Sequence, residues 1–277
     1  MSICCFVLTL NESKNIGNCI ESLELIFAKG DIYVLDSGSN DGTAEIVNRK
    51  KIKLLTNIQT GTYSAASQRN FALEYAKYQN YDWVFFIDAD EYLSESFIKN
   101  SFNDISKYQN FDVISIPMLY RLHGENIKSM GYPNWHDRIV RTNQVFKASV
   151  GEYIESNSRA YEKELEIVHN FNSLGMRRFI EKQSRYAEYI GKQIFDYSEG
   201  NISDYFYKPG IKGFLKKAFS NLGLLRPFVR FFYQYIFRLG FLEGKSGFIA
   251  ATYMFVFEFL VAVAVIEYKR EKSNLVL

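Results

Sequence analysis

The sequence predicts an α/β fold in which a mostly parallel sheet is flanked by helices and is followed by a helical C-terminal extension. In the first 90 residues, short apolar runs alternate with segments of helical periodicity, which is the pattern of βαβ units. From Leu174 onward, apolar residues recur at helical spacing, as in "MRRFIEKQSRYAEYIGKQIF". We therefore expect one domain over residues 1–172 and a helical extension over residues 173–277.

The individual elements follow in a regular order along the chain. Apolar runs rich in β-branched and aromatic residues predict strands at 3–10, 31–36, 52–56 and 83–88. The segments between them predict helices near 13–27, 44–50 and 64–78. Beyond these, the patterning of 111–124 and 135–142 predicts further strands, which we expect to be antiparallel.

The composition fits a protein with a packed core. Hydrophobic residues make up 47% of the 277 residues and charged residues 23%. The three cysteines, Cys4, Cys5 and Cys19, are odd in number and lack the spacing of a zinc site, so we expect buried free thiols in a reducing cytosol. The N-terminus has no basic leader, and we predict a cytoplasmic protein.

Polar residues follow three of the predicted strands. Asn11–Glu12 comes after the first strand, Asp36 ends the second, and Asp88, Asp90 and Glu91 stand at the end of "WVFFID" and just beyond it. In parallel sheets, ligands bind beyond the carboxyl ends of the strands, so we expect these side chains to share one site.

Three acids so close together need a positive charge among them. An Arg, a shared proton or a divalent cation would supply it, and Mg²⁺ or Mn²⁺ is commonly held by one or two carboxylates plus substrate phosphates. Neither G-x-G-x-x-G after the first strand nor G-x-x-x-x-G-K-[ST] occurs, which argues against a dinucleotide oxidoreductase and a P-loop NTPase. A ligand whose phosphates are held by carboxylates and a metal points to a nucleotide-sugar.

Four segments resemble family 2 glycosyltransferases with the GT-A fold: "LTLNESKNIGNCIESL", "VLDSGSNDGTAEI", "AASQRNFALEYA" and "DWVFFIDADEYL". Three later segments resemble the bacterial lipopolysaccharide-core and lipooligosaccharide β-glucosyltransferases: "DRIVR", "HNFNSLGMRRFIEKQSRY" and "RLGFLEGKSGFIAATYMFVFEFL". The resemblance implies inverting transfer of a hexose, glucose above all, from a UDP-sugar to a core glycan or another cell-surface glycan.

The resemblance also implies roles at the donor site. Asn11, Glu12 and Asp36 would line the nucleotide pocket, and Arg69 in "QRN" would approach the diphosphate. Asp88 would hydrogen-bond the ribose or bind the metal.

The Mg²⁺ or Mn²⁺ ion implied by the resemblance would be bound directly by Asp90, with Asp88 beside it. His169 in "VHNFN" matches a His that would complete the metal shell or contact the diphosphate. A structural role for this His is the alternative.

Inverting transfer also needs a base that takes the proton of the acceptor hydroxyl. Where the family often has "VHE", this chain has "SVGEYIE", which places Glu152 at the base position and Gly151 where a His is usual. Glu155 as the base, or Glu152 as a plain loop acid, are the alternatives. The residues expected to shape the acceptor pocket are Trp135, His136 and Asp137.

The C-terminal part is basic and aromatic. Residues 205–242 carry seven cations and no acid, with twelve aromatic residues among them. This pattern suits an anionic membrane surface, the protein's own core or single-stranded nucleic acid, and we favour the membrane and expect no nucleic acid partner. The apolar segment 248–266 has Glu258 near its centre, so we expect a packed or interfacial helix rather than a membrane span.

Two other functions stay open at this point. A protein or peptide glycosyltransferase of the same fold would share these motifs. A non-catalytic, nucleotide-sugar-binding membrane scaffold is the alternative from a different class, since Gly151 departs from the family pattern.

Overall fold

The computed structural model describes residues 1–59, 64–101, 105–149, 151–201 and 217–273. The chain divides into two units, which are described separately. The first consists of Met1–Arg121 and Tyr132–Ser173, and the second of Leu122–Gly131 and Leu174–Leu277.

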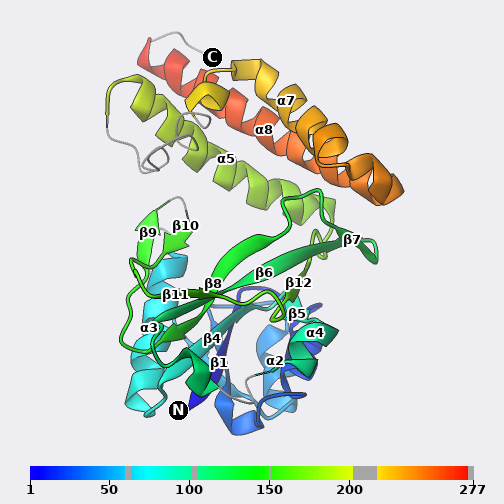
Figure 1. The fold of residues 1–277 in the computed structure, drawn as a ribbon. Coiled ribbons are helices and arrows are strands. Elements are labelled where there is room, and N and C mark those ends of the chain that lie inside the picture. Colours follow the sequence, from blue (N-terminus) through cyan, green and yellow to red (C-terminus); the bar gives the residue numbers. More distant parts are fainter. Residues whose placement is uncertain (60–63, 102–104, 150, 202–216, 274–277) are drawn as a thin grey trace. The chain divides into compact units, whose positions relative to one another are not determined.

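The first unit is built around a mixed sheet with the strand order β3-β2-β1-β4-β8-β6-β12-β5 (Figure 1). Its parallel half consists of the four strands expected from the first 90 residues: β1 (Ile3–Thr9), β2 (Ile32–Asp36), β3 (Lys53–Thr56) and β4 (Trp83–Asp88). The other sheet strands are β5 (Glu91–Leu93), β6 (Val113–Leu122), β8 (Asn134–Arg141), β11 (Arg159–Tyr161) and β12 (Ile167–Asn170). Strand β8 is antiparallel to both β4 and β6, as expected for this part of the chain.

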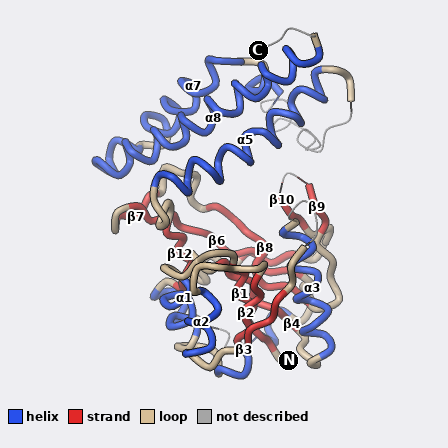
Figure 2. The backbone as a smooth tube through the Cα atoms, turned by 180° about the vertical axis from the view of Figure 1, so that it is seen from behind, coloured by secondary structure: helices blue, strands red, loops and turns tan. Residues whose placement is uncertain are grey.

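Helices cover both faces of this sheet (Figures 1 and 2). The longer ones are α1 (Ile16–Leu23), α2 (Thr43–Arg49) and α3 (Ala65–Tyr78), and the short ones are α4 (Glu95–Lys99), η1 (Lys29–Asp31) and η2 (Ile105–Tyr108). Successive residues of a strand face opposite sides. Cys5 of β1 therefore packs with α1 and α2 in one core cluster, whereas its neighbour Phe6 packs with α3 in the other.

The three cysteines are buried and form no disulfide, as predicted. Cys4 and Cys5 lie on β1 and Cys19 on α1. Burial raises the pKa of the Cys5 and Cys19 thiols well above the usual range, so these side chains act as small apolar core residues.

Strand β8 contains a β-bulge at Arg138. Ile139 pairs with Ile114 of β6, but the next pair joins Asp137 to Ser115, so Arg138 has no partner opposite it on β6. A bulge changes the direction of side chains next to it and is frequent beside active sites. The bulge places Arg138 where its guanidinium reaches the end of β4.

The second unit is mainly helical. It contains α5 (Met176–Ser198), the 3₁₀ turn η4 (Gly223–Leu225), α7 (Arg226–Phe232), the π-helical turn η5 (Tyr233–Phe237), the 3₁₀ turn η6 (Gly240–Glu243) and α8 (Gly244–Lys272), with the short strand β7 (Glu125–Ile127). The helical pattern predicted from Leu174 onward is therefore confirmed for the described residues.

Helices α5 and α8 run in the same direction, side by side. Phe179 lies against Tyr253 with 4.4 Å between the ring centroids, and Phe195 lies against Tyr268 at 5.9 Å. Between these two contacts the helices come very close, because a Cβ placed on Gly191 would lie 2.6 Å from the Cβ of Ala264. Helix α8 is thus accompanied by α5 along most of its length.

Among the described residues, the helical stretch Gly240–Lys272 alone is long and apolar enough to cross a membrane, a test that the core helix of a soluble protein also passes. Glu258 near its centre is buried, and its Oε2 accepts hydrogen bonds from Nε and Nη2 of Arg226, at 3.1 and 2.6 Å. The negative charge of Glu258, which would make a membrane span costly, is therefore paired with Arg226 inside the second unit.

Candidate functional site

The loops after β1 and β2 are tied together at the carboxyl edge of the sheet. The backbone N–H of Asn11 donates to Oγ of Ser39 at 2.8 Å, and Oδ1 of Asn11 accepts from the N–H of Asn40 at 2.9 Å. Asn11 has a φ of 58°, a left-handed conformation that Asn tolerates better than most residues. The structure thus brings Asn11 and the turn after Asp36 into one network.

Asp36 is buried and organises the turn that follows it. Its Oδ2 accepts the backbone N–H groups of Ser39 at 2.8 Å and Gly38 at 3.2 Å, and its Oδ1 accepts the Ser39 hydroxyl. Glu12 follows Asn11 in the adjacent loop, where its Oε2 accepts from Nδ2 of Asn15 at 2.6 Å. Both acids therefore hold the loops that border the predicted nucleotide pocket.

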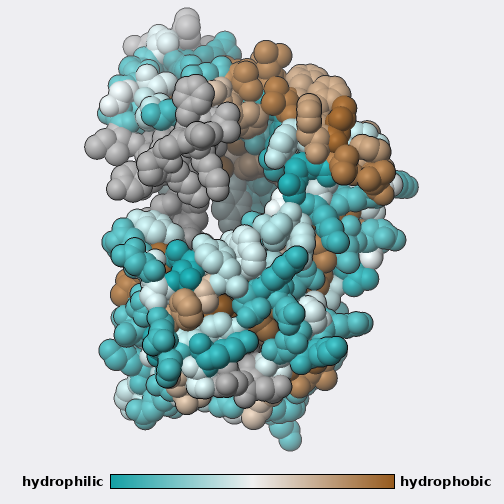
Figure 3. Space-filling model, viewed as in Figure 1, coloured by the Kyte–Doolittle hydropathy of each residue, from teal (hydrophilic) through white to brown (hydrophobic). Residues whose placement is uncertain are grey.

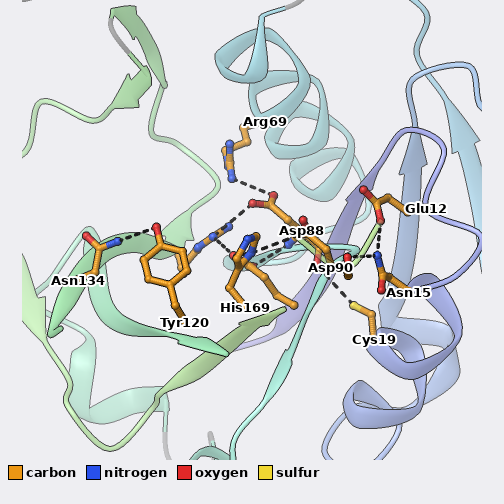
Figure 4. Close-up of polar contacts among 12 residues, drawn as sticks. Glu12, Asn15, Cys19, Arg69, Asp88, Asp90, Tyr120, Asn134 and His169 are labelled. Carbon is orange, nitrogen blue, oxygen red and sulfur yellow. Dashed lines mark hydrogen bonds and ion pairs between the residues drawn. The ribbon is translucent and has the colours of Figure 1, made fainter. Parts of the chain in front are cut away.

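Asp88 lies between two buried arginines at the end of β4 (Figure 4). Its Oδ1 is 3.4 Å from Nη2 of Arg69, and its Oδ2 is 3.3 Å from Nη2 of Arg138. The Arg138 nitrogen also reaches Oε1 of Glu91 at 2.5 Å. Two arginines thus supply positive charge to two of the three acids.

The charge at Asp88 is fixed by this arrangement. Burial by itself would raise the pKa of Asp88, but the guanidinium groups of Arg138 and Arg69 outweigh it and hold the pKa of this carboxyl well below its usual range. Asp88 is therefore an ionised hydrogen-bond acceptor throughout the physiological range. With an arginine on each oxygen, it is better placed to accept from a hydroxyl group than to bind a cation.

Arg69 is packed against two neighbouring aromatic rings. It comes from α3, is almost fully buried, and its guanidinium carbon lies 5.6 Å from the ring centroids of Phe86 and Phe146. Arg69 is therefore not a solvated surface residue. The two rings and the contact with Asp88 restrict the orientation of the planar guanidinium.

Arg138 is the residue that sequence reasoning missed. Its motif "DRIVR" resembles the glycosyltransferase branch, but a role for Arg138 depends on the bulge and on the register of β8, which are not local features. The available signal was indirect. Three acids after one strand required a positive charge, and an arginine was one of the three candidates.

Asp90 and His169 form the other half of the site (Figure 4). Strand β12 pairs with β5 so that His169 lies opposite Glu91, and Nδ1 of His169 is 3.5 Å from Oδ1 of Asp90 and 3.8 Å from Oε1 of Glu91. The ring of His169 packs edge-on against Tyr120, with 5.4 Å between the centroids. The predicted partners Asp90 and His169 are thus side by side.

The residues present fit a cation that protein and ligand would hold jointly. In the described parts of the chain, no group of three or more His, Cys, Asp or Glu side chains is arranged to bind a metal by itself. Asp90 and His169 offer one carboxylate and one imidazole, and carboxylate oxygen suits Mg²⁺ and Mn²⁺. Such cations are usually bound by one or two carboxylates while phosphate oxygens and water supply the remaining ligands.

Of the three residues expected at the acceptor pocket, only His136 faces the acids. Burial and the charge of Arg138 lower the pKa of His136 to about 3, so this ring is neutral. Its neighbours on β8 make contacts elsewhere. Asp137 binds Arg159 at 2.9 Å and the Ser115 hydroxyl, and Trp135 packs against Tyr161 with 5.2 Å between centroids.

The expected base, Glu152, lies on a two-stranded hairpin formed by β9 (Lys147–Ser149) and β10 (Gly151–Tyr153). Its backbone pairs with Ala148. Its side chain lies outside the described part of the structure, so its role stays a prediction. The alternative base, Glu155, is exposed, and its Oε2 is 2.5 Å from Nζ of Lys147.

The three residues of the "QRN" motif each reach a different element from α3. The side chain of Gln68 exchanges hydrogen bonds with Asn57 after β3, at 2.6 and 3.1 Å. Arg69 reaches Asp88. Asn70 donates to the carbonyl of Phe146 at 2.9 Å and accepts its N–H at 2.8 Å. Helix α3 therefore ties the β3 loop, the acidic site and the segment that leads into the Glu152 hairpin.

Comparisons with known proteins show which proteins this chain resembles. The lipopolysaccharide core biosynthesis glycosyltransferase LpsC of Rhizobium meliloti (strain 1021) is 38% identical over 96 residues, which are 33% of this chain and 32% of LpsC. The SPbeta prophage-derived glycosyltransferase SunS of Bacillus subtilis (strain 168) is 33% identical over 94 residues, which are 34% of this chain and 21% of SunS. The matches thus span about a third or less of these relatives.

A solved structure shares the fold over almost the whole chain. The mannosyltransferase PcManGT from Pyrobaculum calidifontis, in complex with GDP-Man and Mn²⁺, has a TM-score of 0.50 at 15% identity and covers 96% of this chain and 87% of its own. The family model of glycosyl transferase family 2 matches residues 4–153, more than half of the chain. The chain therefore belongs to glycosyl transferase family 2 and has the GT-A fold with a C-terminal helical region.

Proposed function

We propose that this protein is an inverting, metal-dependent glycosyltransferase. It transfers a hexose, with glucose as the first candidate, from a UDP-sugar to a lipopolysaccharide or lipooligosaccharide core or another cell-surface glycan. The observation that carries the proposal is the pairing of Asp88 with Arg69 and Arg138 beside Asp90 and His169. The name of the relative LpsC supports the choice of acceptor, and the GDP-Man bound to PcManGT supports a nucleotide-sugar donor.

The donor is bound by side chains from three strand ends. The loops organised by Asn11, Glu12 and Asp36 form the wall for the base and ribose. Asp88, kept ionised, accepts a hydrogen bond from a donor hydroxyl. Arg69, packed against two rings, contributes positive charge toward the diphosphate.

Asp90 and His169 would hold the Mg²⁺ or Mn²⁺ ion together with the donor diphosphate. When bound, this ion would offset the negative charge that grows on the leaving diphosphate. The buried network around Arg138 keeps Asp90 in place by fixing the turn between β4 and β5.

Glu152 is proposed to take the proton of the acceptor hydroxyl as this oxygen attacks the anomeric carbon. The hairpin β9–β10 that carries Glu152 is linked to α3 through Asn70 and Phe146. We place the reaction in the cytoplasm at the inner face of the cytoplasmic membrane, where a growing glycolipid acceptor would be reached.

The test is thermal stabilisation by nucleotides. A ligand that binds only the folded state raises the melting temperature. We expect UDP to stabilise the protein, Mn²⁺ to increase the effect, and Asp90→Ala to abolish the increase, after which UDP-sugars are assayed with core glycans. If no nucleotide shifts the melting temperature of folded protein, the catalytic proposal fails and a scaffold role gains weight.

A further inference from the structure

The second unit carries an apolar surface that faces outward along α7, η5 and η6. Large exposed side chains on it include Phe228 at 52%, Phe232 at 50%, Phe237 at 76% and Leu242 at 70%, and Leu225 at 63% directly precedes α7. The space-filling view shows the corresponding apolar region over α7 and α8 (Figure 3). Single exposed apolar residues need no explanation, but a contiguous group of large ones marks an interaction surface.

The exposed residues form a helical stripe. Leu225, Phe228, Val229, Phe232 and Tyr233 follow one another at steps of three, one, three and one residues, which is the spacing of one helix face. The stripe continues through Ile236 and Phe237. This regularity means that a whole face of the segment, rather than a few scattered side chains, is turned outward.

The opposite face of the same segment is polar and buried. Arg226 is 2% exposed and Gln234 1% exposed, while Phe228, Phe232 and Tyr233 between them are exposed. The side chain of Arg226 is paired with the buried Glu258 of α8. An arrangement with polar groups inside and apolar groups outside is the reverse of a water-facing helix, and it is what a helix in contact with lipid adopts.

Charge specifies the kind of lipid. Apart from the buried pair of Arg226 and Glu258, the chain from Lys217 to Phe257 has four cations and one acid, Glu243. That acid is engaged internally, because its Oε1 accepts the backbone N–H groups of Lys128 and Ser129 at 2.6 and 2.8 Å. Three further cations of residues 205–242, namely Lys208, Lys212 and Lys216, lie outside the described residues. A surface with basic residues and no competing acid is attracted to anionic headgroups.

The packing of α5 against α8 argues for a position in one leaflet and against a membrane span. Helix α5 follows α8 closely from Phe179 to Phe195 and contains eight charged residues, among them Arg185 and Lys192. A spanning α8 would draw these charges into hydrocarbon at high cost. The side of α8 that packs on α5 is therefore not available to lipid.

We propose that the second unit docks on an anionic bilayer by inserting the α7–η5–η6 face into the interfacial region of one leaflet, without α8 crossing the membrane. The proposal rests on the membrane location given under the proposed function and names the face that makes the contact. Its test needs neither donor nor acceptor, so its failure is distinguishable from a failure of the proposed glycosyl transfer. The proposal assigns the membrane contact to the exposed residues of α7, η5 and η6. The sequence pattern alone pointed only to the basic and aromatic tail as a whole.

The test is vesicle flotation with the full chain. The vesicles are phosphatidylcholine alone or phosphatidylcholine with phosphatidylglycerol, and the variant is Phe232→Glu/Phe237→Glu. The matched control is Ile58→Glu/Tyr78→Glu, which makes the same charge change at two exposed apolar residues of the first unit. We expect binding to the anionic vesicles, a loss of about tenfold or more in the variant, and no comparable loss in the control.

Three results would overturn the proposal. The first is equal binding by the variant and the unmodified protein, with both melting at the same temperature. The second is a protein that does not bind vesicles but forms a dimer, while the variant is a monomer. The apolar face would then be the interface with a second copy of the chain. The third is a chain that stays in membranes after an alkaline carbonate wash, which would assign a span to α8.

Discussion

Arg138 and Glu91 form a buried ion pair that fixes the acidic turn after β4. Nη2 of Arg138 lies 2.5 Å from Oε1 of Glu91, and the two side chains are 4% and 1% exposed. The Oε2 of Glu91 accepts the backbone N–H of Asp88 at 2.9 Å. One arginine from a bulged strand therefore holds the side chains of Asp88 and Glu91 and the backbone between them.

Removing one partner of this pair is expected to cost more than removing both. Arg138→Met leaves Glu91 buried without its charge partner, which typically costs about 3–5 kcal/mol of unfolding free energy. Arg138→Met/Glu91→Gln removes both charges, and we expect a smaller loss than in the single variant. Urea unfolding measures both values. A double variant that is less stable than Arg138→Met would contradict this account.

Arg69 is expected to matter for donor binding more than for folding. Arg69→Met keeps an unbranched side chain against Phe86 and Phe146 but removes the charge, so the melting temperature should change little. Hydrogen bonds to charged groups contribute about 1.5–3 kcal/mol, so UDP affinity should fall by about ten- to a hundredfold. Calorimetric titration with UDP measures this, and Arg49→Met, at an exposed arginine of α2, is the control.

Some of this site follows from sequence and some does not. The carboxyl ends of parallel strands meet at one edge whatever the details of packing, so Asn11, Asp36 and Asp88 could be predicted to lie at one edge. Arg138 could not, because its position depends on an antiparallel register and one extra residue in β8. The same register turns Trp135 and Asp137 away from the acids.

The second unit illustrates the same limit. Helical spacing predicts α5 and α8, and the Glu within α8 predicts a packed or interfacial helix rather than a membrane span. The identity of its charge partner, Arg226, depends on how α7 packs on α8, which spacing within either helix does not specify. Local patterns in the sequence therefore do not show which residues pair across long sequence distances.

His136 predicts how stability depends on pH. Its pKa is lowered to about 3 in the folded protein from 6.5, so below pH 6.5 the unfolded chain takes up a proton that the folded chain does not. Stability should therefore fall as the pH is lowered from about 6.5, by up to about 1.4 kcal/mol per pH unit.

His136→Gln should flatten this dependence between pH 6.5 and about 4.5, above the range in which the carboxylates begin to titrate. Chemical unfolding at a series of pH values measures the slope. His123→Asn is the matched control, because His123 is exposed and has a φ of 52°, a backbone conformation that Asn accepts. Equal slopes for the two variants would refute the assignment to His136.

The start of α8 depends on the absence of a side chain at Gly247. A Cβ at this position would lie 2.0 Å from the carbonyl oxygen of Gly240 and 2.8 Å from Cβ of Glu243. Gly247→Ala must push η6 away from α8, and overpacking of this kind costs about 1–3 kcal/mol or more. Gly30→Ala has open space around the new Cβ and serves as the control. The melting temperature of Gly247→Ala should lie several degrees below that of Gly30→Ala. Equal melting temperatures would mean that η6 moves away from α8 without loss of stability.

Asn70 connects the donor site to the hairpin that carries Glu152, and its removal should affect turnover rather than donor binding. Its side chain makes two hydrogen bonds with the backbone of Phe146, directly before β9, whereas Arg69 is paired with Asp88. Asn70→Ala frees this anchor while the ion pair of Arg69 with Asp88 and the ring of Phe86 are kept. Since a displacement of about 1 Å can cost roughly a hundredfold in rate, we expect kcat to fall by about ten- to a hundredfold while the dissociation constant for UDP stays nearly constant.

The control for this prediction is Lys77→Ala on the exposed side of the same helix, which should change neither quantity. The two measurements separate two roles of α3. If Asn70→Ala weakens UDP binding as much as it lowers kcat, the residue supports the donor pocket as a whole. If only kcat falls, the hairpin is the part of the structure that places the base, and Glu152→Gln should then reduce turnover further than Asn70→Ala without affecting UDP binding.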